Sequence, residues 1–204
     1  MYPHVYCLLE PPAGPKEREA FQAQLRLLDW PYETTGLTYC EMPQFDKSTL
    51  KPSWYSAHPV RWAEIRGHMY AWQLALSSQE DTSAFLPSSL NAVDGGAEAL
   101  TRFWQILPGQ WEMVCFSGRT TNTTKALSLP ANVPERSLKV LRGVNETAYA
   151  IRREALRDLH DYVLEKLLMP AVQNPMNLQL RKLLADYQED CQQMVFCPLL
   201  WIAR

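Results

Sequence analysis

The sequence predicts an α/β domain in which a mixed, mostly parallel central sheet is flanked by helices. Short apolar runs with strand character alternate with longer segments whose apolar residues recur every three or four positions. Such alternation is typical of a sheet that is packed on both faces. The chain has 204 residues, 47% of them hydrophobic, which suffices for one domain with a sizeable core. We therefore interpret residues 1–204 as a single domain.

The first quarter of the chain predicts two strands, one helix and a loop. The apolar run His4–Leu9 predicts an opening buried strand, because it is short and ends at Glu10-Pro11-Pro12. Helical spacing follows over Lys16–Leu28, and Pro31 ends that element. A second strand is predicted over Tyr32–Tyr39. Residues 41–59 contain three prolines and little periodicity, which predicts a loop that lies over a site.

The middle of the chain carries the strongest helical pattern, over Arg61–Ser77. Its apolar positions recur at steps of three and four, at Trp62, Ile65, Met69, Trp72 and Leu76. A short strand is predicted at Ala84–Leu86, a helix at Ala97–Leu107 and a buried strand at Trp111–Phe116. The polar stretch 117–133 predicts a loop.

In the last third of the chain, predicted strands and helices alternate again. Short strands are predicted at Leu138–Leu141 and Ala148–Ile151, and a helix at Arg152–Leu168 that Pro170 stops. A last helix is predicted over Leu178–Tyr187, and an apolar segment, Met194–Ile202, closes the chain.

Global charge gives no reason to expect nucleic acid or a membrane as a partner, because the net charge is −2 and the pI is about 6.1. Locally, the segment from Arg119 to Arg153 is basic. Two acidic residues, Glu135 and Glu146, oppose its seven basic residues, which are Arg119, Lys125, Arg136, Lys139, Arg142, Arg152 and Arg153. This local excess fits a phosphate-bearing ligand, and it fits ordinary solvated charge equally well.

Cysteine usage indicates a reducing compartment. The five cysteines include no C-x-x-C pair, which argues against a disulfide framework and a zinc site. Cys7, Cys115 and Cys197 stand in apolar runs and are interpreted as buried thiols. The N-terminus has no secretory pattern and no stretch reaches 18 apolar residues. We expect a cytoplasmic protein without a membrane span.

Several candidate ligand-binding side chains stand outside any standard motif. The sequence has no phosphate-binding glycine loop of either common type and no nucleophile elbow. His68 shares a helix face with Ile65 and Trp72, where it is either a core histidine or a polar group at the floor of a cleft. Trp54 and Tyr55 lie in the proline-containing loop, where they could stack on a sugar or a base, or pack in the core.

One segment resembles glycosyltransferase family 25, the family of lipopolysaccharide and collagen sugar transferases. Residues 67–76, Gly-His-Met-Tyr-Ala-Trp-Gln-Leu-Ala-Leu, are similar to the family's helix in which a small residue precedes a histidine and a tryptophan follows. Residues 107–114, 148–155, 175–177 and 198–201 resemble its later strands and helices in order and spacing. The resemblance covers about 5–201. It implies a GT-A-like fold and transfer of a sugar from a nucleotide-sugar donor.

The resemblance also implies where the donor binds. The first strand, up to Leu9, would meet the nucleotide. His68, Ser88 and Ser89 would lie near the diphosphate, and Asn177 near the transferred sugar. The acceptor would contact Trp54 and Tyr55, and Asp94 is the expected catalytic base. The acceptor is a glycan, a lipid-linked sugar or a modified nucleic-acid base, which the basic segment would help to hold.

Two departures from the family concern the divalent metal, Mn or Mg, that neutralises the diphosphate in such enzymes. Ser88 and Ser89 stand where the family has an acidic cluster, and Asn177 stands where it has an aspartate. Three explanations follow. The metal is held elsewhere, by Glu80, Asp81 or Asp94. Arginines (Arg66, Arg119 or Arg142) neutralise the diphosphate instead. Or the domain has lost catalysis and binds a nucleotide or a protein partner.

Overall fold

The computed structural model describes residues 2–10, 13–42, 59–116, 125–128, 138–144, 147–168, 179–198 and 202. Within this part of the chain, one sheet of eight strands has the order β2-β1-β3-β7-β4-β8-β6-β5. The strands are β1 (His4–Leu9), β2 (Leu37–Glu41), β3 (Thr82–Pro87), β4 (Met113–Cys115), β5 (Lys125–Leu127), β6 (Leu138–Arg142), β7 (Tyr149–Arg152) and β8 (Val195–Pro198). The helices are α1 (Pro15–Leu27), α2 (Tyr32–Thr35), α4 (Pro59–Ser77), α5 (Gly96–Ile106), α6 (Arg153–Leu168) and α7 (Leu180–Asp190).

The sheet is mixed, and six of its eight strands run in one direction. β1 pairs in parallel with β2 and β3, and β4 with β8. β7 is antiparallel to both β3 and β4, and β6 is antiparallel to both β8 and β5. Only β6 and β7 are therefore reversed among the described strands. The predicted α/β fold with a mixed, helix-flanked sheet is confirmed.

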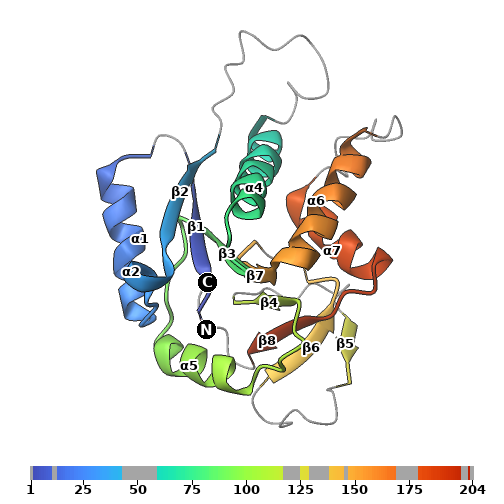
Figure 1. Cartoon of the computed structure of the whole chain (residues 1–204). Helices are drawn as coiled ribbons and strands as arrows, with labels where there is room; N and C mark the ends of the chain where they lie inside the picture. The colour runs from blue at the N-terminus through green and yellow to red at the C-terminus, as the bar shows by residue number, and fades with distance from the viewer. Residues whose placement is uncertain are drawn as a thin grey trace.

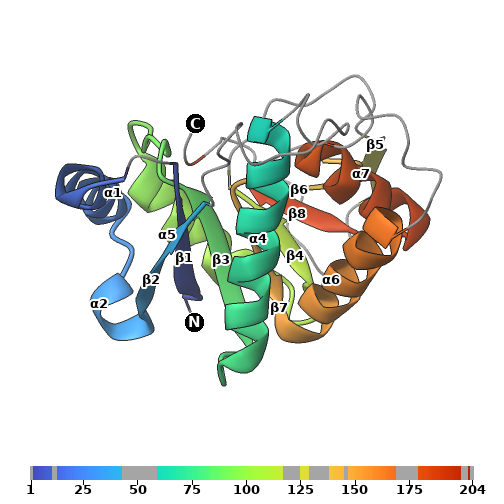
Figure 2. The ribbon, with the colours of Figure 1, turned by 90° about the horizontal axis from the view of Figure 1, so that it is seen from above.

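Helices cover both faces of the sheet, as Figures 1 and 2 show. α4, α6 and α7 pack on one face, where Trp72, Leu159 and Leu184 belong to one apolar core. α1 and α5 pack on the other, where Leu25 and Phe103 belong to a second core. Because β1 lies between the two layers, its side chains alternate between the two cores and are almost all buried. This explains why the first strand is a continuous apolar run.

The segment after Pro31 differs from its prediction. Residues 32–35 form the short helix α2, and β2 begins only at Leu37. Gly36 separates the two with a φ of 97°, a backbone conformation that glycine adopts without strain. The predicted strand Tyr32–Tyr39 is therefore wrong in its first half, because a turn intervenes that hydrophobic periodicity does not reveal.

Other boundaries shift by less. The predicted strand Trp111–Phe116 is reduced to Met113–Cys115, and the last helix runs to Asp190, three residues beyond its predicted end. β5 lies inside the predicted loop 117–133 and is an exposed edge strand without an apolar run. The predicted buried thiols Cys7, Cys115 and Cys197 are confirmed as buried.

Candidate functional site

The three parallel strands β2, β1 and β3 end together at one edge of the sheet. The N–H of Met42, just after β2, donates to the carbonyl of Leu9 at 3.0 Å. On the other side of β1, the N–H of Ser88 donates to the carbonyl of Leu8 at 2.9 Å. Ligands of open α/β sheets bind beyond the carboxyl ends of such strands. We call this edge, formed by residues 9–10, 41–42 and 88–89, the carboxyl edge.

The first half of α4 lies against the carboxyl edge. Gly67 faces the side chain of Met42, and a Cβ at position 67 would stand only 2.6 Å from Met42 Cγ. The missing side chain thus allows the helix to approach the end of β2, and Figure 1 shows the start of α4 beside it. Consequently the polar residues in the first two turns of α4 are brought to this edge.

One of these residues, Glu64, carries a perturbed carboxyl group. Burial raises the pKa of Glu64 above its ordinary value, while the positive charge of Arg181 opposes the rise and the negative charge of Glu10 adds to it. Glu10 directly follows β1, and Arg181 lies in the first turn of α7. Two charged groups from different parts of the chain therefore influence one partly desolvated carboxyl. Such an environment is one in which a carboxylate can serve as a proton acceptor.

Arginines accompany Glu64 on α4. Nη1 of Arg61 is buried and has no hydrogen-bond partner among the described residues. Arg66 is exposed. Guanidinium groups present several fixed donors that match phosphate oxygens. Arg181 contributes a further guanidinium, near enough to Glu64 to lower its pKa.

His68 lies one helical turn after Glu64 and is buried, with 2% of its surface exposed. Its Nδ1 is 3.3 Å from the hydroxyl oxygen of Tyr149 on β7, and the same oxygen accepts a hydrogen bond from Trp72 Nε1 at 2.8 Å. Burial lowers the pKa of His68 to about 3, so the ring is neutral at physiological pH. The structure places His68 inside the α4 core layer, below the carboxyl edge.

The serines and Asp94 follow β3 in a loop that crosses to the other face of the sheet. Ser88 is half-buried and Ser89 is exposed. The loop then packs on the α1 side, where the N–H of Ala92 donates to Gln24 at 2.9 Å. Asp94 is exposed just before α5. The sheet thus separates the loop that carries Asp94 from the helix that carries His68 and Glu64.

The alternative metal ligands Glu80 and Asp81 lie at the opposite end of β3 from Ser88. β3 has six residues, so the two ends are about 20 Å apart. Among the described residues, no three His, Cys, Asp or Glu side chains gather closely enough to hold a metal ion. Four other predicted site residues, Trp54, Tyr55, Arg119 and Asn177, lie outside the described part of the chain.

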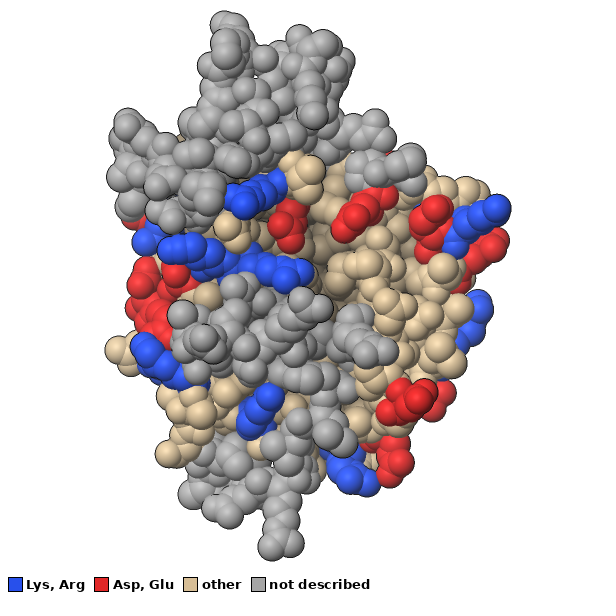
Figure 3. All heavy atoms as spheres, turned by 180° about the vertical axis from the view of Figure 1, so that it is seen from behind, with Lys and Arg blue, Asp and Glu red and all other residues tan. Residues whose placement is uncertain are grey.

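Described members of the basic segment make contacts within the chain. Nζ of Lys125 lies 2.7 Å from a Glu189 oxygen, and Arg142 donates to the carbonyl of Gln192 at 3.1 Å. Arg152 donates to the carbonyl of Gly109, and Arg153 to the carbonyls of Leu76 and Ser78. Acidic and basic side chains are interspersed on the face that is turned away in Figure 1 (Figure 3). These contacts favour a structural role for this part of the segment.

Comparison with known proteins finds similarity in structure and none in sequence. No protein-family model matches it, and no curated protein matches its sequence. Among solved structures, it is similar to a glycosyltransferase involved in the glycosylation of the major capsid of PBCV-1. The identity is 12%, the TM-score is 0.41, and the match covers 85% of this chain and 71% of that one. No helix in the described residues is long and apolar enough to cross a membrane.

Proposed function

We propose that the protein transfers a glycosyl group from a nucleotide sugar to an acceptor hydroxyl at the carboxyl edge, as a GT-A-like enzyme similar to glycosyltransferase family 25. The observation that carries the proposal is the position of the Glu64 carboxyl, which is half-buried on α4 within electrostatic reach of Arg181 and Glu10; burial raises its pKa. Transfer to a hydroxyl needs a group that removes the hydroxyl proton and positive charge near the departing diphosphate. The edge supplies both.

Glu64 is the proton acceptor in this proposal. Its raised pKa brings the carboxylate closer to the basicity that proton abstraction requires. The proton moves from the acceptor hydroxyl to a Glu64 oxygen as the hydroxyl oxygen bonds to the sugar carbon. The bond from that carbon to the diphosphate oxygen breaks, and the nucleoside diphosphate leaves with the bonding electrons.

The arginines bind the diphosphate. Arg61 has a buried Nη1 without a partner among the described residues, and an anion would satisfy it. Arg66 and Arg181 add charge on the same side of the sheet. The hydroxyls of Ser88 and Ser89 can donate to phosphate oxygens. They do not fit a divalent metal well, because Mg²⁺ and Mn²⁺ prefer carboxylate ligands. We assign no step to a metal.

Binding without transfer is the second candidate function. It is favoured by one observation, that serines follow β3 where the family has carboxylates. The same cluster of arginines would then hold a nucleotide or nucleotide sugar. The two candidates share a binding site and differ only in turnover.

A ligand screen followed by matched variants tests the proposal. Thermal unfolding is measured with UDP-, GDP- and CMP-sugars, each with Mn²⁺ and with EDTA, because a ligand of the native state raises Tm. We expect one nucleotide class to raise Tm, and Arg181→Met to remove the shift. The control is Arg102→Met, since Arg102 is paired with Glu98 on α5, across the sheet. No shift with any nucleotide sugar would contradict both candidates.

Release of nucleoside diphosphate then separates transfer from binding. We expect Glu64→Gln to lower turnover about 100-fold or more while the Tm shift persists, since general-base catalysis contributes about 10²–10⁴-fold. Glu98→Gln should leave turnover unchanged. Binding by the wild type without any turnover would establish the second candidate.

A further inference from the structure

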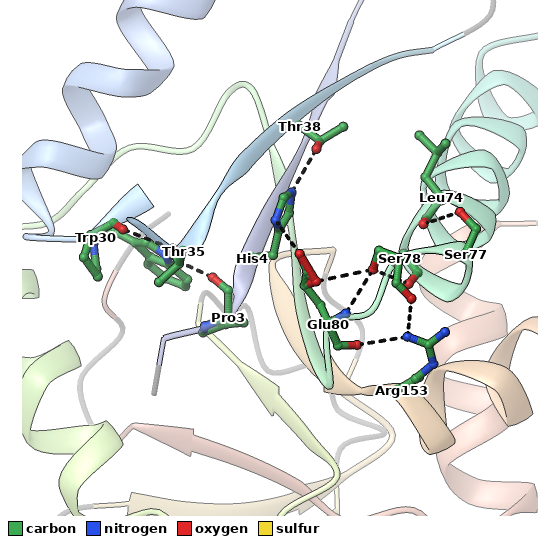
Figure 4. A network of polar contacts seen from close by, with 12 residues as sticks. Pro3, His4, Trp30, Thr35, Thr38, Leu74, Ser77, Ser78, Glu80 and Arg153 are labelled. Carbon is green, nitrogen blue, oxygen red and sulfur yellow. Dashed lines mark hydrogen bonds and ion pairs between the residues drawn. The ribbon is translucent and has the colours of Figure 1, made fainter. Parts of the chain in front are cut away.

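The amino ends of β1 and β3, opposite the carboxyl edge, hold an imidazole and a carboxylate in a row with a hydroxyl from β2. His4 opens β1, Thr38 lies beside it on β2, and Glu80 precedes β3. Nε2 of His4 is 2.8 Å from Thr38 Oγ1, and Nδ1 is 3.5 Å from a Glu80 carboxylate oxygen. Figure 4 shows the His4 ring between the other two side chains. The order is that of a nucleophile, a base and an orienting group.

The surroundings of His4 fix which nitrogen carries the proton. Nδ1 faces an acceptor, the Glu80 carboxylate. Nδ1 therefore holds the hydrogen, and Nε2 offers its lone pair. It follows that the Thr38 hydroxyl donates to Nε2. Burial lowers the pKa of His4, with Glu80 opposing that effect, so the ring remains an acceptor at neutral pH.

Neighbouring residues hold this row in place. A Cβ at position 36 would stand 2.3 Å from His4 Nδ1. Because Gly36 has no side chain, the His4 ring can occupy this space. The ring of Tyr6 lies 4.8 Å from the His4 ring, centroid to centroid. Glu80 is in turn bonded to Ser78, and its backbone carbonyl accepts from Arg153 at 3.3 Å. His4 and Thr38 remain partly exposed and Glu80 is 37% exposed, so a small substrate can reach them.

The strand also supplies a donor for an oxyanion. Among the described strands, β2 is the last at its side of the sheet. The carbonyl of Gly36 and the N–H of Met42 both form hydrogen bonds with β1. The backbone N–H and C=O groups of even-numbered residues of β2 therefore point toward β1, and the backbone N–H of Tyr39 points away from it. In other hydrolases the N–H of the residue after the nucleophile stabilises the developing oxyanion.

From this geometry we propose that Thr38, His4 and Glu80 form a second reactive site, which hydrolyses small activated esters through an acyl-threonine. Thr38 Oγ1 attacks the carbonyl carbon, and its proton passes to His4 Nε2. The ester C–O bond breaks, and the alcohol leaves with the proton from His4. Water then attacks the acyl group, gives a proton to His4, and Thr38 is regenerated as the free acid departs. Glu80 is a positioning residue for the His4 ring.

Hydrolysis of p-nitrophenyl acetate by the full chain tests the site, with peptide mass spectrometry to locate the acetyl group. We expect acetyl on Thr38, and p-nitrophenolate release at least about 100-fold slower in Thr38→Val and His4→Gln. Thr38→Ser should retain activity. The control is Thr34→Val, because the Thr34 hydroxyl donates to the carbonyl of Pro31 at 2.9 Å and Thr34 lies outside the proposed site. Tm of each variant verifies folding.

The role of Glu80 has its own measurement. Its charge raises the pKa of His4, so Glu80→Gln should move the acid limb of the rate profile to lower pH and slow the plateau rate. A mere loss of stability would not move that limb. Unchanged p-nitrophenolate release in folded Thr38→Val, or acetyl groups found only elsewhere, would overturn the proposal. Because Glu64 and the arginines belong to the carboxyl edge, failure of the ester-hydrolysis proposal would leave the glycosyl-transfer proposal standing.

Discussion

The hydroxyl oxygen of Tyr149 accepts a hydrogen bond from Trp72 Nε1 at 2.8 Å in the core between β7 and α4. Tyr149 and Trp72 are both completely buried. The hydroxyl also lies 3.3 Å from His68 Nδ1, within hydrogen-bond distance of the imidazole. One phenol therefore satisfies two polar groups that the apolar core would otherwise leave unpaired.

Tyr149→Phe is expected to lower the free energy of unfolding by about 1–3 kcal/mol, because it leaves buried polar groups without a partner. Tyr187 provides the comparison, since among the described residues its buried hydroxyl has one hydrogen-bond partner, the carbonyl of Ala155, at 3.2 Å. Tyr187→Phe should cost less than Tyr149→Phe. Urea denaturation of both variants measures the difference. Equal losses would mean that His68 and Trp72 find other partners.

The stability of the fold should decrease as the pH is lowered, because His68 is held neutral in the folded state. Its pKa is about 3 in the folded state and about 6.5 in the unfolded chain. Between these values the unfolded state binds more protons, so the free energy of unfolding decreases as pH falls from about 6.5 toward 3. His4, whose pKa is also lowered, acts in the same direction.

The measurement is urea denaturation of the wild type and His68→Met between pH 7 and pH 4. The variant should lose less stability over this interval, with a residual slope from His4 and the carboxyl groups. A slope as steep as that of the wild type would show that His68 becomes protonated in the folded state.

Gly36 and Gly95 both have positive φ, 97° and 75°, and they differ in their surroundings. A Cβ at position 36 would collide with the His4 ring, whereas at position 95 nothing lies within 4 Å. Gly95→Ala should therefore cost about 1–2 kcal/mol from backbone strain alone. Gly36→Ala should cost more and should also displace His4. Thermal unfolding compares them, and similar Tm values would refute the steric argument.

The fold could be predicted largely from local patterns, because they report burial. The run at β1 is apolar since both faces of that strand are covered, and the stripe on α4 matches its buried face. Gly36 shows the limit of this reasoning. Its positive φ ends α2 and redirects the chain, and no hydrophobic period marks such a turn.

The candidate site was harder to predict than the fold. His68 stood out because it lies on an apolar helix face. Glu64 did not, although it precedes His68 by one helical turn, because its environment depends on Glu10 and Arg181, which only the folded chain brings near it. Asp94 was the predicted base, and the loop after β3 carries it to the other face of the sheet. Tertiary contacts, rather than sequence spacing, define this site.

The two charged neighbours of Glu64 shift its pKa in opposite directions, so removing each charge should have opposite effects on the pH dependence of activity. Arg181 lowers the pKa of Glu64 and Glu10 raises it. Since a general base acts when deprotonated, the acid limb of kcat/KM reports the pKa of Glu64 in the free enzyme. Arg181→Met should move this limb to higher pH, and Glu10→Gln should move it to lower pH.

The profiles are measured by release of nucleoside diphosphate from the donor identified by thermal shift. Lys182→Met is the control for the first variant, because Lys182 lies on the same helix and pairs with Asp186. Shifts of opposite sign in the two variants identify Glu64 as the group that titrates, since no change in donor affinity alone would reverse direction between them. An acid limb that stays fixed in both would assign the base to another residue.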